Sequence, residues 1–290
     1  MIDSDTDLEV SLPIVNTLQG QCARVENVFD TIMCKKTQKE CLRRWGPRLL
    51  CTTFVQDSLD MILNFATIIN TLSFAWTSPI ACSIVFGLAS CQLAGAYFLV
   101  SRDHFRVKTA CYFLAFLVGA RPWIFSLSEG LHFVRAITMS GSLFLLASLA
   151  IPRDVGRKQD VAGISDAIQL VGRVFMTTLF FVEAIVSEYG GLHGLLVAPS
   201  LLGFVGYMAL LGASCMVCVG FKTQASALVL AFILLLASLW MYPFWWCAAD
   251  QRRVLMFLFF QTISITGGLF LLASHGPGGF SVEAALRKQV

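Results

Sequence analysis

Long apolar runs, separated by short polar stretches, fill most of the chain after residue 45. A run of about 20 apolar residues is what a helix needs to cross the hydrocarbon core of a bilayer. The pattern therefore predicts an all-α, polytopic membrane protein with about eight spans, four before and four after a polar linker. The expected spans are Leu49–Ile69, Pro79–Val100, Val107–Leu127, Leu131–Ile151, Leu170–Val186, Leu195–Val219, Gln224–Tyr242 and Val254–Ser274.

Polar stretches divide the chain into regions around these spans. The N-terminal segment ends in a basic run, CKKTQKECLRRW, which we expect to form a helix on the cytosolic membrane surface. The expected regions are a cytosolic segment (1–45), a four-helix unit (46–151), a cytosolic linker (152–169), a second four-helix unit (170–277) and a cytosolic tail (278–290).

The two four-helix units resemble one another. FVRAITMSGSLFLLASLAIP, from Phe133, aligns with FFQTISITGGLFLLASHGPG, from Phe259, so that Gly141 pairs with Gly267. The same offset places TTFVQDSL of the first span over TLFFVEAI, from Thr178. The chain is therefore expected to contain two repeats. Because each has an even number of spans, the repeats should be parallel, with a site at their interface.

Composition narrows the possible functions. The 290 residues are 57% hydrophobic and 13% charged, and the net charge of +3 is too small to indicate a nucleic-acid partner. The acidic N-terminus, MIDSDTDLEVSLP, does not read as a cleavable signal peptide. Most of the ten cysteines lie inside apolar runs, which indicates packing and not a disulfide framework. No metal, phosphate or nucleophile motif is evident, so we expect no cofactor and no enzymatic activity.

Basic residues predict the orientation in the membrane. Lys and Arg collect on one set of flanks, which places both termini in the cytosol. These residues are Lys35, Lys36, Lys39, Arg43, Arg44, Arg48, Arg102, Arg106, Lys108, Arg153, Arg157, Lys158, Arg173, Lys222, Arg287 and Lys288, against Arg252 and Arg253 on the other side. The other side carries aromatic residues, including Trp123 and Trp245, which form either an interfacial belt or a binding surface facing the lumen.

Two carboxylates are expected near the membrane midplane. Asp57 and its repeat-mate Glu183 lie inside their spans, and Asp60 is one turn below Asp57 on the same face. Ionisable groups at this depth are costly and need a partner or a wet cavity. Arg121 and Arg135 are the candidate cations.

Arg135 has polar neighbours of its own. Glu129 and His132 are close to it in sequence, and Gln261 is its repeat-mate. Two interpretations remain open for these charged residues. They form either a structural polar clamp between the two halves or a charged pocket that opens to the lumen and captures a ligand.

Several segments resemble a known family. QLVGRV (169–174), GFKT (220–223), FFQTISITGG (259–268) and GPGG (276–279) look like those of the surfeit-locus-four family of endoplasmic-reticulum cargo receptors, which includes the yeast Erv-type receptor. The first span, RLLCTTFVQDSLDM, resembles the family's R-L-x-x-x-T-F-L-E-D-G-x-R-M. Thr53, Phe54 and Asp57 match, whereas Gln56 stands in place of Glu and Asp60 in place of Arg. The resemblance covers most of 48–279.

The resemblance implies a receptor in the endoplasmic-reticulum and early Golgi membranes. It would bind soluble secretory proteins in the lumen, enter COPII vesicles and return in COPI carriers through a dilysine-type tail signal. In the tail ALRKQV, Lys288 is third and Arg287 fourth from the end. Cargo amino-termini or short apolar motifs would dock between the repeats. The expected cargo residues are Asp57, Asp60, Trp123, Glu129, Arg135, Glu183, Trp245 and Gln261.

Two other classes remain open. A transporter of small molecules or lipids could use the midplane carboxylates for proton coupling. A membrane redox accessory protein is suggested by the cysteine content and by a remote likeness to four-helix DoxX proteins. The receptor predicts co-purification with secretory cargo, whereas the transporter predicts flux in liposomes.

Overall fold

The computed structural model describes residues 36–72, 76–125, 130–151, 159–185, 201–247, 249–276 and 278–287. The chain divides into two units, Met1–Cys41 and Leu42–Val290. Of the first unit, only the beginning of one helix is among the described residues. All other described residues belong to the second unit.

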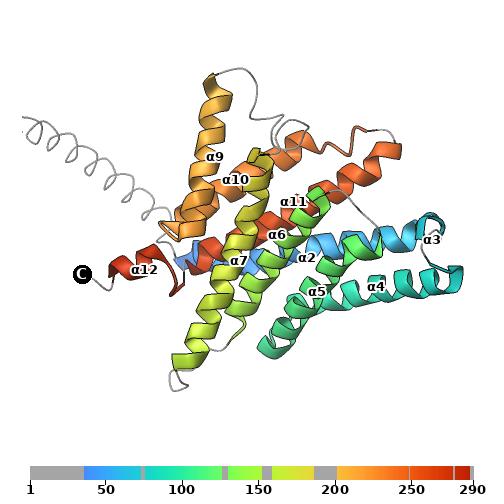
Figure 1. Ribbon diagram of the computed structural model, residues 1–290, viewed down its shortest axis with the longest axis horizontal. Coiled ribbons are helices and arrows are strands. Elements are labelled where there is room, and N and C mark those ends of the chain that lie inside the picture. Colours follow the sequence, from blue (N-terminus) through green and yellow to red (C-terminus); the bar gives the residue numbers. More distant parts are fainter. Residues whose placement is uncertain are drawn as a thin grey trace, which may run out of the picture. The chain divides into compact units, whose positions relative to one another are not determined.

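The described residues are helical, without strands, as the apolar pattern predicts (Figure 1). Every expected span contains a helix. In chain order the helices are α2 (Lys36–Leu63), α3 (Phe65–Leu72), α4 (Ser78–Leu99), α5 (His104–Ile124), α6 (Gly130–Leu149), α7 (Gln159–Ile185), α9 (Leu201–Val219), α10 (Thr223–Met241), α11 (Ala249–His275) and α12 (Val282–Arg287).

Among the described residues, five helices contain stretches long and apolar enough by themselves to cross a membrane, which is consistent with a polytopic membrane protein. These stretches are Ser78–Leu99, His132–Leu149, Gly163–Val182, Thr223–Met241 and Gln251–His275. Helices α2 and α5 carry charged residues within their lengths, among them Asp57 and Arg121, which lower their hydropathy. Asp57 and Arg121 therefore lie on the two least apolar of the helices α2 to α6.

The structure departs from the expected boundaries at two places. Helix α2 runs without interruption from the basic run through Pro47 into the first span, and the break comes at Asn64, inside that span. Helix α7 begins at Gln159, within the expected linker. Its first turns pack on α6, where the Ser165 hydroxyl donates to the carbonyl of Ser148 at 3.1 Å. The linker residues from Gln159 onward are thus part of a helix.

Local sequence explains several helix ends. Asp103 caps α5, because its side chain accepts a hydrogen bond from the Phe105 amide at 3.1 Å. Helix α4 begins with a proline at its second residue, where a missing N–H is tolerated. Helix α11 ends at His275, directly before Gly276, whose φ of 82° is left-handed and favours glycine.

Glycines allow two pairs of helices to approach closely. A methyl group on Gly267 of α11 would lie 2.8 Å from the carbonyl oxygen of Gly46 in α2. A methyl group on Gly141 of α6 would likewise lie 2.8 Å from the carbonyl oxygen of Gly172 in α7. Small residues at such positions are what close packing of membrane helices requires. The pairs α2–α11 and α6–α7 are therefore in backbone contact.

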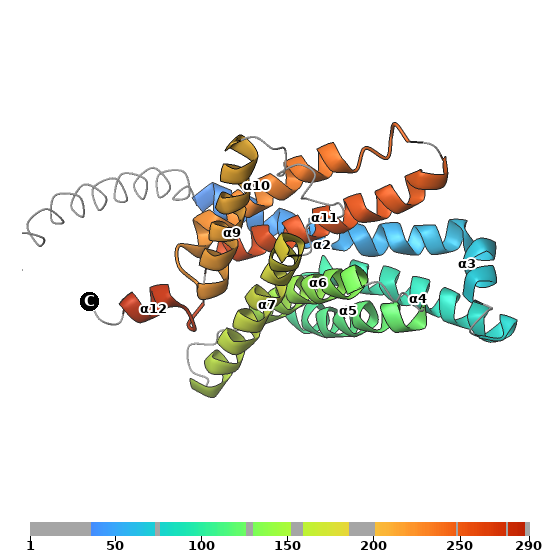
Figure 2. The same cartoon turned by 45° about the horizontal axis from the view of Figure 1, so that its top comes forward.

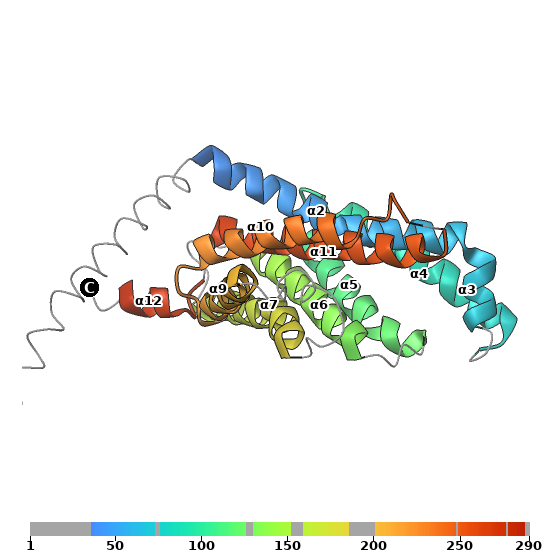
Figure 3. The ribbon, with the colours of Figure 1, turned by 90° about the horizontal axis from the view of Figure 1, so that it is seen from above.

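Helix α6 has a central place, in contact with α5, α7 and α11 (Figure 1). Helices α4 and α5 pack on one another (Figure 2), and α10 packs along α11 (Figure 3). The C-terminal end of α5 and the N-terminal ends of α6 and α11 lie at the same end of the bundle (Figure 1). The charged residues of α2 meet these ends.

Candidate functional site

The site is built on one face of α2, which carries Thr53, Asp57 and Asp60. Residues at i, i+4 and i+7 share one face of a helix. Two hydrogen bonds fix α2 on α11: the Thr53 hydroxyl donates to the Phe260 carbonyl at 2.8 Å, and the Ser264 hydroxyl donates to the Leu50 carbonyl at 2.6 Å. The carboxylates are therefore held at a defined rotation of the helix.

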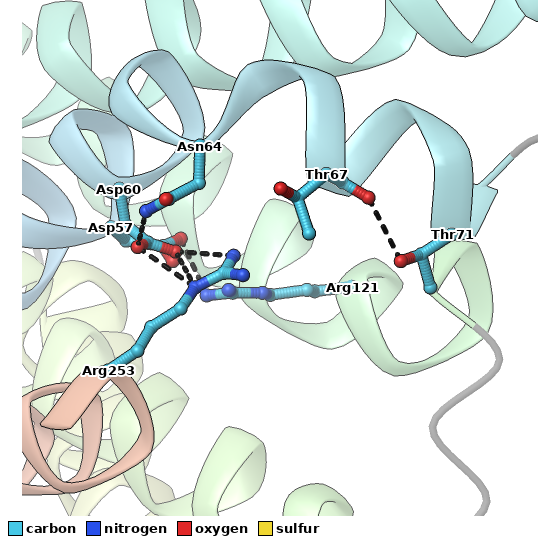
Figure 4. Close-up of polar contacts among 7 residues, drawn as sticks. All are labelled: Asp57, Asp60, Asn64, Thr67, Thr71, Arg121 and Arg253. Carbon is cyan, nitrogen blue, oxygen red and sulfur yellow. Dashed lines mark hydrogen bonds and ion pairs between the residues drawn. The ribbon is translucent and has the colours of Figure 1, made fainter. Parts of the chain in front are cut away.

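Asp57 forms an ion pair with Arg121 of α5. Arg121 Nη1 lies 2.5 Å from Asp57 Oδ2, and only 3% of the Asp57 side chain is exposed (Figure 4). The guanidinium also lies over the Phe257 ring, 5.0 Å from its centroid, a cation–π contact. The contact confirms Arg121 as a partner of Asp57. This buried pair ties α2 to α5 and, through Phe257, to α11.

Asp60 forms a second ion pair, with Arg253 near the beginning of α11. Arg253 binds the carboxylate through both Nε and Nη2, at 2.9 and 2.8 Å from Oδ2, and Nε also lies 3.0 Å from Oδ1. The Asn64 amide donates to Asp60 Oδ1 at 2.7 Å. Figure 4 shows the two carboxylates side by side, approached by the two guanidiniums. The second pair is the more exposed, with 40% of the Arg253 side chain accessible.

Both ion pairs line a cavity of about 520 Å³ among α2, α4, α5, α6 and α11. This volume is within the range of ligand pockets, about 300–1,000 Å³. Its polar lining includes Gln92, His132 and Gln261, and its apolar lining includes Phe54, Met139 and Phe257. A ligand with both a charged group and an apolar group would find partners for each on these walls.

Arg135 lies beside this cavity and binds two other groups. Its Nη1 donates to Gln261 Oε1 at 3.4 Å, and its Nη2 donates to the Tyr242 hydroxyl at 3.3 Å. The side chain is 4% exposed, and Gln261 stands between it and the cavity as a lining residue. Arg135 is therefore placed to set the orientation of the Gln261 amide.

Of the remaining predicted residues, the two tryptophans lie outside the cavity, and the others have side chains outside the described part of the chain. Trp123 is 77% exposed and packs edge-on against Phe133, and Trp245 packs against Phe244 and Phe259; neither tryptophan lines the cavity. Glu129 and Lys288 lie outside the described residues. Glu183 and Arg287 belong to α7 and α12, but their side chains are outside the described part.

The sequence interpretation missed Arg253 as a site residue. It was counted only as a basic residue in the loop opposite the cytosolic flanks. One available signal was its spacing from Gln261. The two residues are eight positions apart, so they share one face of a helix if that helix begins before Arg253. Helix α11 does begin at Ala249, so the cation that pairs with Asp60 comes from this helix.

The arrangement suits binding more directly than catalysis. Two carboxylates and two guanidiniums neutralise one another inside a partly apolar cavity, so an incoming ammonium or carboxylate can exchange with an internal partner. Among the described residues, no group of three or more His, Cys, Asp or Glu side chains could hold a metal ion.

The comparison with protein-family models decides the family. The model described as the SURF4 family matches residues 19–289. The chain belongs to the SURF4 family. No solved structure matches this SURF4-family chain.

Two curated relatives match about nine tenths of the chain, and a third matches less than half of it. The Surfeit locus protein 4 homolog of Drosophila melanogaster is 28% identical over 282 residues, covering 92% of this chain and 97% of the relative. The ER-derived vesicles protein ERV29 of Saccharomyces cerevisiae is 23% identical over 277 residues, covering 90% and 82%. The inner membrane protein YqjF of Escherichia coli is 32% identical over 132 residues, which is 43% of this SURF4-family chain but 97% of YqjF.

Proposed function

We propose that this SURF4-family protein is an ER-to-Golgi transport receptor without enzymatic activity. It binds soluble secretory proteins on the lumenal side, enters COPII vesicles and returns by COPI through a dilysine-like signal at Arg287 and Lys288. The name of its relative ERV29, an ER-derived vesicles protein, supports this assignment. The membrane helices and the charged cavity are the features that a receptor of this kind needs.

The cavity carries the proposal. A volume of about 520 Å³ accommodates a short peptide segment and not a folded domain. Cargo would therefore be recognised through a few residues, such as an amino-terminus or a short apolar motif. The ammonium of an amino-terminus would compete with Arg121 or Arg253 for the carboxylates of α2, while an apolar side chain would pack on Phe54 and Phe257.

The position of the cavity supports a lumenal opening. The cavity lies where α5 ends and α11 begins. The exposed basic residues Arg102 and Arg106 lie at the opposite, N-terminal end of α5. With basic flanks in the cytosol, both termini are cytosolic and the cavity faces the lumen.

Two parallel four-helix repeats are part of the proposal. Arg135 binds Gln261, which is 126 residues further along the chain, the offset that aligns the two halves. The glycine contacts exchange at the same offset, Gly46–Gly267 in one pair of helices and Gly141–Gly172 in the other. YqjF matches 43% of this chain over almost its own full length, which supports a half-chain unit.

Comparing secreted proteins from cells with and without this chain tests the receptor function. Quantitative mass spectrometry should show a few soluble proteins retained in the cells that lack it. Re-expressed wild-type protein should restore their export, and Arg135→Ala should not. An unchanged secretome would contradict the receptor and direct attention to transport of small molecules or lipids, measured as flux in liposomes.

The site has its own control. Asp103 and Arg106 form an exposed ion pair, 3.1 Å apart, at the other end of α5. Asp103→Asn should leave export unchanged, whereas Asp57→Asn should reduce it several-fold at equal abundance in the endoplasmic reticulum. Normal export by both Asp57→Asn and Arg135→Ala would show that this cavity is not the cargo site.

A further inference from the structure

A polar face of α7 meets the segment after α11. Asp166, Gln169 and Arg173 lie at i, i+3 and i+7 and so share one face of α7. Gln169 and Arg173 belong to the QLVGRV segment, and the chain that crosses them is the GPGG segment. Two segments that stand more than 100 residues apart in the sequence are therefore in direct contact.

Hydrogen bonds to backbone carbonyls hold this contact. The Gln169 amide donates from Nε2 to the Gly276 carbonyl at 2.8 Å. Arg173 donates from Nη2 to the Phe280 carbonyl at 2.5 Å. The two bonds bracket the turn between α11 and α12. Because carbonyls are the acceptors, α7 recognises the path of the chain and not its side chains.

Glycines bring the segment directly onto α7. Gly276 and Gly278 have φ values of 82° and 75°, in the left-handed region. A methyl group on Gly278 would collide with the Gln169 side chain, and one on Gly279 would collide with the Asp166 carboxylate. The path taken by the segment leaves no space for side chains on its inner side.

The turn between α9 and α10 also contacts Arg173 and the residues after α11. Gly220, with a φ of 80°, lies against Arg173 and Ser281, so that a methyl group there would meet both. The Glu283 amide donates to the Gly220 carbonyl at 3.4 Å, which anchors the first turn of α12. Helix α12 is thus held against the turn between α9 and α10.

Arg173 is a costly residue for this position. Its side chain is fully buried, and its Nε and Nη1 atoms have no acceptor among the described residues. Arg173 attracts the nearby Asp166 carboxylate, but a buried ion pair often contributes no more stability than apolar residues of similar volume. Stability of the core therefore does not explain the arginine, whereas its bond to Phe280 does.

We propose that Gln169 and Arg173 are positioning residues for the C-terminal tail. They fix α12, which ends at Arg287, and so set the direction in which the chain leaves the membrane unit at Lys288. This role rests on the proposed function insofar as the tail carries the retrieval signal. A coat protein that binds Arg287 and Lys288 would then meet a signal that follows a docked helix, and not one on a freely moving chain.

Hydrogen exchange of the full-length protein in nanodiscs tests the contact itself. Arg173→Met should speed exchange of the α12 amides, including that of Glu283, about tenfold, because a bond from a charged donor is lost. Because Asp166, which loses this cation, is only half-buried, any fall in the melting temperature should be small. Gln169→Leu, which removes only the bond to Gly276, should give a smaller increase, and the exposed Arg102→Met none. Unchanged α12 exchange in both Arg173→Met and Gln169→Leu would overturn the proposal.

Localisation in cells tests the consequence. Arg173→Met should shift the protein from the endoplasmic reticulum toward later compartments at least twofold. A flexible Gly-Ser linker followed by two lysines at retrieval positions should return it, which no folding defect would allow. If that extension failed to return it, positioning would be the wrong explanation. If Lys288→Ala in the wild-type protein changed nothing, the signal itself would be wrong, whatever the exchange result.

Discussion

Arg121 and Arg173 lie near opposite ends of α11. They differ in how deeply they are buried and in the groups that they bind. Arg121 faces the Asp57 carboxylate and lines a cavity, with 25% of its side chain exposed. Arg173 is fully buried and donates to the Phe280 carbonyl. A guanidinium paired with a carboxylate at a cavity can exchange partners with a ligand. A guanidinium bound to a backbone carbonyl in a closed site instead holds the chain in one path.

The neighbouring residues follow the same division. Around Arg121 the cavity is lined with side chains such as Gln92 and Gln261, whose polar atoms differ in kind and direction. At Arg173 and its neighbour Gln169 the contacts come from glycines, Gly220 against Arg173 and Gly278 against Gln169. Side-chain diversity suits recognition of a ligand, whereas glycine suits close packing of backbone. This difference agrees with the roles that we propose for the two ends of α11, ligand binding at one and positioning of α12 at the other.

The largest expected effect is on the stability of the protein, and it distinguishes Arg121 from Arg173. Arg121→Ala leaves the Asp57 carboxylate buried without its cation, and removal of one partner of a buried pair typically costs about 3–5 kcal/mol. Since Arg121 is partly exposed, we expect the lower end of that range. The melting temperature of the protein in detergent should fall clearly, whereas that of Arg173→Met should not.

Arg106→Ala is the matched control for this loss. Arg106 pairs with Asp103 on the surface, and exposed pairs contribute about 0–1 kcal/mol. A fall for Arg106→Ala as large as that for Arg121→Ala would remove the basis of the comparison. So would an Arg173→Met variant that melts as early as Arg121→Ala.

An intermediate effect is expected at Gly278, in the segment after α11. Gly278→Ala forces a side chain into left-handed backbone, which costs about 1–2 kcal/mol, and pushes its methyl group against Gln169. Exchange of the α12 amides should therefore rise while that of α2 stays unchanged. Gly87→Ala, where no atom lies within 4 Å of the added methyl, should alter neither. A parallel rise in α2 would mean that the two ends are not independent.

The smallest expected effect concerns the outer ion pair of the cavity. Arg253→Ala should destabilise the protein by about 1 kcal/mol or less, because the pair is partly exposed and Asn64 still donates to Asp60. A double-mutant cycle with Asp60→Asn should give a coupling that weakens as salt is raised. A coupling as large as that of Asp57 with Arg121 would make the two pairs equivalent and remove the distinction between an inner and an outer pair.

The apolar pattern predicted the helices well because each span must be apolar over its own length. The sequence also indicated the Asp57 face and offered two partners for it, Arg121 and Arg135. Arg121 does pair with Asp57, whereas Arg135 binds Gln261 and Tyr242. The sequence did not identify Arg253, since pairing with Asp60 depends on how α11 packs beside α2. Nor could it separate Trp123 from the cavity residues, because a tryptophan near a helix end reads the same whether it faces lipid or ligand. The contact between Gln169 and the glycines after α11 depends on tertiary packing alone.

The contact between Arg135 and Gln261 bears on how such a chain could arise. In a chain built from two like halves, as we propose, these residues occupy the same place in each half, and they touch one another. A dimer of two identical halves would set an arginine against its own copy, with like charges in contact. Joining the halves in one polypeptide lets each copy diverge, so that a donor on one side meets an acceptor on the other. Fusion thus permits an asymmetric centre that no symmetric ancestor could have had.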